Sequence, residues 1–273
     1  MSPIDHFSYG LLTPVLAYVM SSTGSLLGLL LTSRARLIGG REGRFWLAGA
    51  ALAIGGTGIW TMHFIAMMGF SVRGTVIRYD ALLTTASALI AVVVVGAGLF
   101  LVARGGTRPG YLLGGGTLTG LGVAGMHYLG MYAMNMSGHV DYDPMVVTIS
   151  VLIAVVAATV ALWFTVRVNH PVAITGAALM MGVAVSGMHY TGMFAMSVRL
   201  REVTGPVPGS KAIDFLLPLI VALSLVTVGL LLTVILSPSP KELRIDREFS
   251  ERLEAKKAER AAEVNLFGAP RSD

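Results

Sequence analysis

"GMHYLGMYAM", residues 125–134, and "GMHYTGMFAM", residues 187–196, are near copies of each other inside otherwise apolar sequence. A looser copy, "TMHFIAMMGF", stands at residues 61–70. The three motif histidines, His63, His127 and His189, are separated by 64 and 62 residues. A period of this length indicates an internal repeat of a small supersecondary unit. The motif therefore decides both the architecture that we expect and the place where we look for chemistry.

The composition is that of an integral membrane protein. Hydrophobic residues make up 54% of the chain and charged residues 13%, against about 25% charged residues in soluble domains. A bilayer core about 30 Å thick needs about 20 apolar residues in helical form. Seven segments meet this need, at residues 9–32, 45–70, 81–103, 111–134, 145–167, 171–197 and 213–236. We expect an all-α membrane protein with seven transmembrane helices, built from three two-helix repeats plus a seventh helix.

The positions of the basic residues predict the orientation. Eleven Lys and Arg residues lie in loops 33–44 and 104–110, at the end of the fifth segment and at the start of the tail, against five on the other side. Because cytoplasmic loops are enriched in Lys and Arg, we expect the N-terminus outside and the C-terminus in the cytoplasm. All three histidines then lie roughly 10–12 Å below the outer surface on helices that run in the same direction.

The remaining sequence excludes several classes of function. The chain has no cysteine, so disulfides, thiolate metal sites and cysteine nucleophiles are absent. No carboxylate lies deep within a span to act as an acid or base, so we do not expect an enzyme. The loop arginines are explained by membrane topology, so we expect no nucleic-acid partner. We divide the chain into a membrane domain, residues 1–237, and a short charged cytoplasmic tail, residues 238–273, which we expect to be helical.

The motif residues form a candidate metal site. On a helix, positions i, i+4 and i+7 lie within about 60° of one another. In the second and third copies this stripe holds one histidine and two methionines, whereas Phe70 replaces the last methionine in the first copy. Imidazole and thioether ligands suit copper, especially Cu(I), better than zinc, magnesium or calcium. The predicted metal ligands are His63, Met67, His127, Met131, Met134, His189, Met193 and Met196.

Other interpretations stay open at this point. Methionine stripes often serve packing alone. Haem is an alternative cofactor, with His127 and His189 or a His/Met pair as axial ligands and no covalent attachment motif. Copper transport is a weaker alternative, because a relay needs ligands at successive depths and these form one layer. The pattern does not say whether the three stripes face one site, and His6 and His139 are further, weaker candidate ligands. Asp80, Asp143 and Asp214 are predicted to cap helices or interact with helix dipoles.

The motifs "MHFIAM", "MHYLGM" and "MHYTGM", in this order and on alternate helices, resemble the MHYT domain of bacterial membrane sensors. The resemblance covers about residues 7–236. It implies an inner-membrane domain that binds copper through the motif His and Met residues and senses a diatomic gas (O2, CO or NO) or redox state. The first copy departs from the pattern at Phe64 and Phe70.

Many members of this family carry cyclic-di-GMP or other signalling domains, and this sequence shows none. We therefore expect any signal to pass to a partner protein in the cytoplasm or the membrane. A homodimer within the lipid bilayer stays open.

Overall fold

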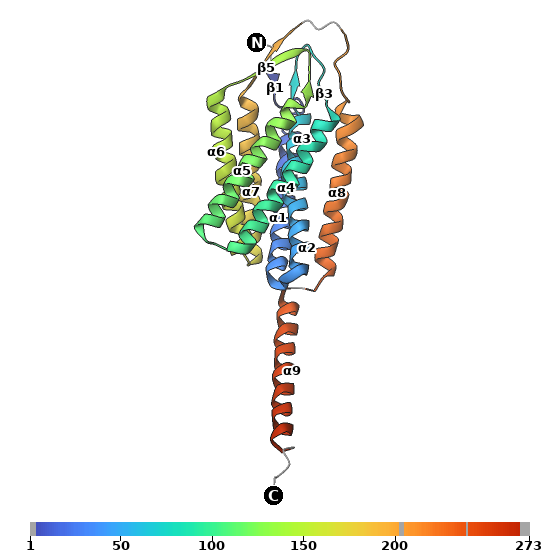
Figure 1. Cartoon of the computed structure of the whole chain (residues 1–273). Helices are drawn as coiled ribbons and strands as arrows, with labels where there is room; N and C mark the ends of the chain where they lie inside the picture. Colours follow the sequence, from blue (N-terminus) through green and yellow to red (C-terminus); the bar gives the residue numbers. More distant parts are fainter. Residues whose placement is uncertain (1–3, 202–204, 239, 268–273) are drawn as a thin grey trace. The chain divides into compact units, whose positions relative to one another are not determined.

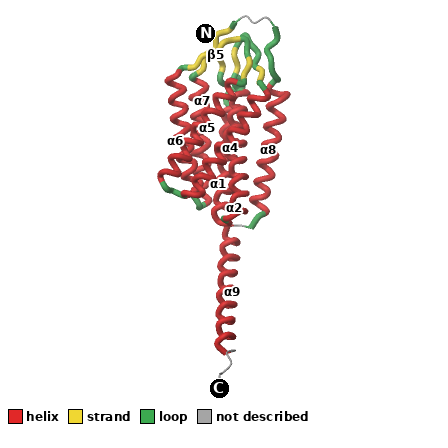
Figure 2. Tube along the Cα trace, viewed as in Figure 1, coloured by secondary structure: helices red, strands yellow, loops and turns green. Residues whose placement is uncertain are grey.

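The computed structural model describes residues 4–201, 205–238 and 240–267. The chain divides into two compact units, Met1–Val234 and Ile235–Asp273. The first unit is a helical bundle, and the second contains helix α9, Pro240–Phe267. Figures 1 and 2 show the bundle as long helices with short strands gathered at one end.

The bundle follows the predicted two-helix repeat. The second helix is continuous but contains a ten-residue π-helix, η1, between its α2 and α3 parts. The segments are α1 (Leu12–Ile38), α2 (Gly40–Ala51), η1 (Leu52–Thr61), α3 (Met62–Met68), α4 (Ala81–Gly105), α5 (Pro109–Tyr132), α6 (Pro144–Arg167), α7 (Pro171–Phe194) and α8 (Ala212–Leu236).

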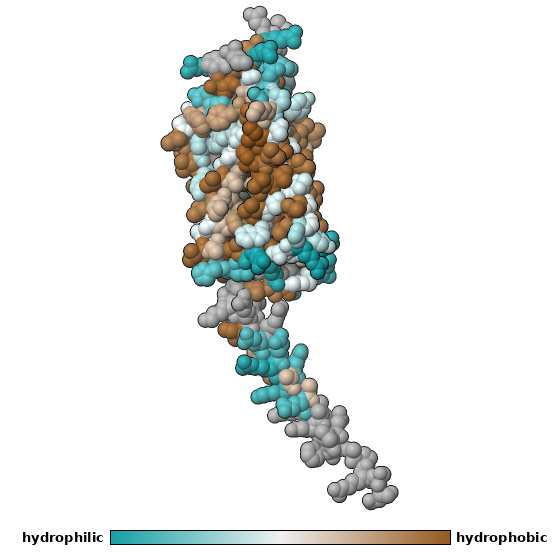
Figure 3. Space-filling model, turned by 90° about the vertical axis from the view of Figure 1, so that its left-hand side faces the viewer, coloured by the Kyte–Doolittle hydropathy of each residue, from teal (hydrophilic) through white to brown (hydrophobic). Residues whose placement is uncertain are grey.

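Within the described residues, six helices are long and apolar enough to cross a membrane. They correspond to six of the seven predicted spans, and the exception is α5. This helix has a comparable length, but its many glycines lower its mean hydropathy. On the face shown in Figure 3, hydrophobic side chains cover the middle of the bundle and hydrophilic ones its ends. The all-α membrane class is thus confirmed, while the seventh span and the orientation stay predictions.

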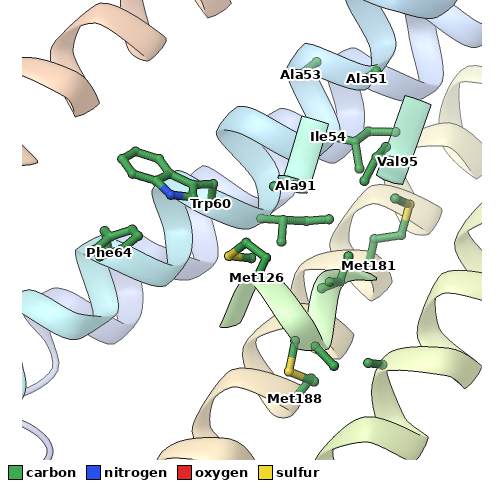
Figure 4. Packing of buried hydrophobic residues seen from close by; sticks show 14 of the residues in the cluster. Ala51, Ala53, Ile54, Trp60, Phe64, Ala91, Val95, Met126, Met181 and Met188 are labelled. Atoms are coloured by element: carbon green, nitrogen blue, oxygen red, sulfur yellow. The ribbon is translucent and has the colours of Figure 1, made fainter. Parts of the chain in front are cut away.

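Six helices form a closed ring, with each packed against the next. α1 packs against the continuous helix α2–η1–α3, which packs against α4, and α5 lies between α4 and α6. α7 packs against both α6 and α1 and so closes the ring. α8 lies at the edge of the bundle, where the Thr227 hydroxyl is 2.5 Å from that of Thr57 in η1. The core includes Trp60 and Phe64, which lie side by side in Figure 4.

Three short antiparallel ladders close the bundle at one end. The sequence analysis did not predict them, because strands of two to five residues are too short for a period-2 pattern. Each ladder joins the segment before the first helix of a repeat to the segment after its second helix. The pairs are β1 (Ile4–Asp5) with β2 (Ser71–Val72), β3 (Arg78–Tyr79) with β4 (Met134–Asn135), and β5 (Gly138–Tyr142) with β6 (Met196–Leu200).

We refer to the end with the ladders as the histidine end of the bundle. The opposite end is the arginine end, where α1, α4 and α6 have Arg36, Arg104 and Arg167 in their last turns. Their positive charges interact favourably with the negative, C-terminal ends of the helix dipoles.

Aspartates begin two of the helices at the histidine end. The Asp80 carboxylate accepts a hydrogen bond from the Leu83 amide at 2.9 Å, and Asp143 accepts one from Met145 at 2.8 Å. The predicted caps are therefore confirmed at these two positions. Asp214 lies in the first turn of α8, where its negative charge interacts favourably with the positive, N-terminal end of the helix dipole.

Replacing Asp143 by alanine is expected to destabilise the bundle by about 1 kcal/mol, because the first amides of α6 lose their acceptor. Asp143→Asn keeps an acceptor oxygen and should retain most of the stability. Thermal unfolding of the two variants in the same detergent measures the difference. Equal melting temperatures for the alanine variant and the unchanged protein would contradict a capping role.

Candidate metal centre

Each motif histidine lies at the same place on its own helix. His63, His127 and His189 are five residues before the last residues of α3, α5 and α7. Five residues correspond to about 7.5 Å of helix, and the helices end earlier than the predicted spans because the ladders begin there. All three side chains are buried, with 1% of each residue exposed.

The three imidazoles converge through their Nδ1 atoms. The Nδ1–Nδ1 distances are 3.0 Å between His63 and His189, 3.1 Å between His63 and His127, and 3.4 Å between His127 and His189. The rings are nearly perpendicular to one another, at 79–87°. The question that the sequence left open is thus answered for the histidines, which meet at one site.

This triangle of nitrogens has the size of a metal site. A point equidistant from the three Nδ1 atoms lies about 1.8 Å from each of them. Zinc–imidazole bonds are about 2.0–2.1 Å long, so an outward shift of a few tenths of an ångström would place one ion within bonding distance of all three. These three buried histidines can therefore hold a metal ion.

Hydrogen bonds among the histidines cannot satisfy all three facing nitrogens. Each Nδ1 of a neutral imidazole presents either one hydrogen or one lone pair, so at least two like groups face each other in the triangle. The Nε2 atoms of His63, His127 and His189 are also buried and have no hydrogen-bond partner within the described ranges. A cation between the Nδ1 atoms would accept three lone pairs and so resolve the conflict among these facing nitrogens.

Small residues inside the motif let the imidazoles converge. A Cβ atom on Gly130 would lie 2.6 Å from His63 Nε2, and one on Gly192 would clash with His127 Nε2. The corresponding position in the first copy is Ala66, which is buried. Each glycine follows the histidine of its own helix by three residues, so the imidazole of one repeat lies against the motif backbone of the next.

Glycines before the motif histidines have different neighbours. An added Cβ on Gly55 or Gly120 would clash with the backbone of the adjacent helix, at Ala91 and Val155 respectively, so these two glycines permit close approach of the helices. At Gly125 and Gly187, which immediately precede the "MHY" letters, an added Cβ would meet no other atom within 4 Å. Gly130 and Gly192 could have been recognised from their spacing, because each lies three residues after a motif histidine.

The predicted methionine ligands fall into two groups. Met67, Met131 and Met193 lie one turn beyond the histidines toward the histidine end, and all are buried. Met134 and Met196 are also buried, but they lie in β4 and β6, beyond the ends of their helices. The helical argument for these last two is therefore wrong, because it assumed that the helices continue to residues 134 and 197. Ligation by any of the five methionines stays a prediction.

The two weaker histidine candidates lie in different surroundings. The ring of His6 packs against Phe70 and Phe194, with centroid distances of 5.6 and 4.9 Å. Burial lowers the pKa of His6, and the nearby Asp5 carboxylate opposes this shift. His139 is exposed in β5, and its Nε2 lies 3.5 Å from an Asp141 oxygen. Of the two, His6 is the one that packs against aromatic side chains of the first and third motifs.

The aromatic residues around the motifs are held by equivalent serines. Trp60 donates a hydrogen bond to Ser87 at 2.9 Å, and the hydroxyls of Tyr128 and Ser150 are 2.5 Å apart. Ser87 and Ser150 are 63 residues apart and so equivalent in the repeat, whereas Trp60 and Tyr128 are 68 residues apart and are not equivalent.

Comparison with known families explains this threefold arrangement. The profile of the MHYT family, described as "Bacterial signalling protein N terminal repeat", matches residues 56–115, 120–178 and 182–245. The chain belongs to the MHYT family. Each matched segment includes one motif histidine and the helix that follows it, so the family repeat has the predicted period with a different starting helix.

Curated relatives of this MHYT protein are signalling proteins. It is 36% identical over 242 residues to the bifunctional diguanylate cyclase/cyclic di-GMP phosphodiesterase MucR of Pseudomonas aeruginosa. The aligned region covers 87% of this chain and 35% of MucR. It is 32% identical to the signaling protein YkoW of Bacillus subtilis, over 70% of this chain and 24% of YkoW. The cyclic di-GMP phosphodiesterase NbdA of P. aeruginosa is 37% identical over 56% of this chain and 20% of NbdA.

The chain thus spans about a third or less of the length of these relatives. The match identifies an integral membrane signalling domain of the bacterial inner membrane. No solved structure matches the chain.

Proposed function

We propose that this MHYT protein is a membrane sensor that holds one copper ion, as Cu(I), between the Nδ1 atoms of His63, His127 and His189. The observation that carries the proposal is the triangle of buried Nδ1 atoms with sides of 3.0–3.4 Å. The ion would accept the lone pairs of these three converging nitrogens.

The surroundings favour a singly charged ion. None of the buried side chains in the described residues is an Asp or Glu, so three neutral imidazoles would have to stabilise the whole charge of the ion. The cost of burying a charge in a low dielectric is large and rises with its magnitude, which favours Cu(I) over Zn²⁺. The three methionines one turn away provide soft thioether donors, which also favour Cu(I).

The short distances between the histidines argue against haem. Two axial nitrogens on opposite faces of one iron would be separated by about 4 Å, at about 2 Å per bond. The Nδ1 atoms here approach to 3.0–3.4 Å and leave no gap for a porphyrin plane between any two of them. Haem remains the alternative that a visible spectrum tests directly.

Copper transport is less well supported than sensing. A cleft of about 710 Å³ at the arginine end is lined by four arginines, and no Asp or Glu is among its lining residues. This positive lining opposes the passage of cations. The arginines are Arg36, Arg44, Arg104 and Arg167.

The sensing step follows from the number of helices that hold the ion. A Cu(I) ion held by three imidazole nitrogens would leave a coordination position for a diatomic gas. Binding of a gas would alter the preferred positions of ligands that lie on three different helices, α3, α5 and α7. We propose that this movement passes to a signalling partner, and the names of MucR and NbdA suggest an enzyme of cyclic di-GMP turnover.

The first test is metal analysis and a visible spectrum of the full chain purified in detergent, before and after reconstitution with Cu(I). The proposal predicts about one copper per chain, no Soret band, and an infrared band of bound CO under a CO atmosphere. A Soret band would establish the haem alternative. Copper content near zero after reconstitution would overturn the proposal.

Replacing Met67, Met131 and Met193 together by leucine is expected to weaken Cu(I) binding about tenfold or more, because soft donors next to the ion are lost. Leucine has a similar volume, so the fold should be retained. The matched comparison is Met134→Leu with Met196→Leu, which removes two buried thioethers from the ladders. A competition titration with a Cu(I) chelator measures both affinities, and an unchanged affinity in the triple variant would contradict thioether ligation.

A further inference from the structure

An apolar cavity of about 50 Å³ lies inside the ring of helices. Roughly 10–15 Å³ is enough for one water molecule, so the cavity has room for a diatomic molecule. The lining is almost entirely apolar, and two of its few hydroxyls, those of Thr119 and Thr165, already donate to the carbonyls of Val94 and Leu162. Figure 4 shows some of the side chains that line it, including those of Ile54, Val95, Met181 and Met188. An apolar cavity of this kind stays dry and takes up apolar ligands.

The cavity lies directly beneath the histidine cluster. Three of its lining residues, Ile59, Val123 and Val185, precede the three motif histidines by four residues each. Four residues are about one helical turn, or about 6 Å. The motif helices thus present three layers in order: apolar side chains at the cavity, then imidazoles, then the thioethers of the methionines at position i+4. A ligand that approaches the imidazoles from the cavity therefore meets the face opposite these three methionines.

A second hollow, on the outer surface of the bundle, lies next to the cavity. A groove of about 410 Å³ lies between α6 and α7, and its lining includes exposed apolar side chains such as Val156 and Met180. Four residues line both the groove and the cavity, and three of them are alanines: Ala157, Ala161, Met181 and Ala184. The wall between lipid and cavity is therefore thin and made mainly of single methyl groups.

The other side of the cavity is better closed. The cleft at the arginine end shares Leu99 and Thr165 with the cavity. These two residues are only 1% and 3% exposed, respectively. A polar or charged solute that enters the cleft meets four arginines and then this buried pair.

We propose that the cavity is a binding site for a small apolar gas molecule, which enters from the bilayer through the groove between α6 and α7. The gas passes the alanines shared by groove and cavity and then reaches the inner face of the histidine cluster. The last step rests on the proposed copper site, whereas occupation of the cavity does not. The route delivers to the cluster a ligand that is concentrated in lipid, and it excludes hydrated ions.

The first experiment uses xenon as the apolar probe. Crystals of the full chain without metal, pressurised with xenon, are expected to show an anomalous peak in the cavity bounded by Val123 and Ala184. Ala184→Phe should abolish this peak, because the ring fills the shared wall. Val156→Phe adds the same group to the groove outside the cavity and should keep it. Absence of a xenon peak in the unchanged protein, or its persistence in Ala184→Phe, would overturn the proposal even if copper binding is confirmed.

The second experiment tests the route. The Cu(I)-loaded protein in lipid nanodiscs is saturated with CO, and rebinding after flash photolysis is followed in the infrared. Ala184→Phe is expected to slow rebinding about tenfold at unchanged copper content, and Ala157→Leu, a smaller change, to slow it less. Val156→Phe should rebind at the normal rate. Equal rates in all four proteins would overturn entry through this wall, whereas failure to bind CO at all would overturn the proposed gas sensing and leave the xenon result standing.

Discussion

Replacing His127 by alanine is expected to reduce the copper content of the purified protein from about one ion per chain to nearly none. The ion would lose one of three nitrogen ligands in a buried site where water cannot replace it easily. Changes to residues that only orient a ligand typically cost about 10–100-fold in metal affinity, so loss of a ligand should cost more than about 100-fold. Metal analysis after dialysis against a weak chelator measures this effect.

The same loss is expected for His63→Ala and His189→Ala, because the three histidines occupy equivalent positions around one point. His139→Ala is the matched control, since it removes an exposed imidazole of β5. Circular dichroism of each variant shows whether the helices are retained. Copper bound at the normal ratio to any one of the three motif variants would mean that the ion is held elsewhere.

Replacing Gly192 by valine should weaken copper binding about 10–100-fold without removing any ligand. The valine side chain would occupy the space of His127 Nε2 and displace the ring from the triangle. Gly130→Val should act in the same way on His63. A chelator competition titration of both variants, with circular dichroism as a check on folding, measures the effect.

Gly125→Val and Gly187→Val provide the control for these substitutions. They place the same side chain on the same two helices, at positions where a Cβ meets no atom within 4 Å. Copper affinity should change little in these two variants. If all four glycine variants lose the same affinity, the effect comes from helix stability and not from contact with the imidazoles.

The repeat made much of this fold predictable. The 64- and 62-residue spacings of the histidine motifs predicted alternate helices of the same direction, and the structure places the histidines five residues from each helix end. Asp80 and Asp143 cap helices as expected, because capping depends on local sequence.

Other features depend on contacts that sequence patterns do not contain. Helical periodicity tells which residues share a face of one helix, but not which neighbour that face meets, so convergence of the histidines on one point stayed open. The ladders are two to five residues long, and they end α5 and α7 before Met134 and Met196. The π-helix from Leu52 to Thr61 has no distinct sequence pattern beyond its glycines. Each of these features results from packing between segments far apart in the chain.

The most direct test of the proposed copper centre is X-ray absorption at the copper K-edge on the Cu(I)-loaded full chain. We expect the edge of three- or four-coordinate Cu(I) and three imidazole nitrogens at about 2.0 Å from the copper. The imidazole signal should be absent from the His127→Ala/His189→Ala variant. Copper surrounded only by sulfur, or by an imidazole shell that persists in the double variant, would contradict a centre built on His63, His127 and His189.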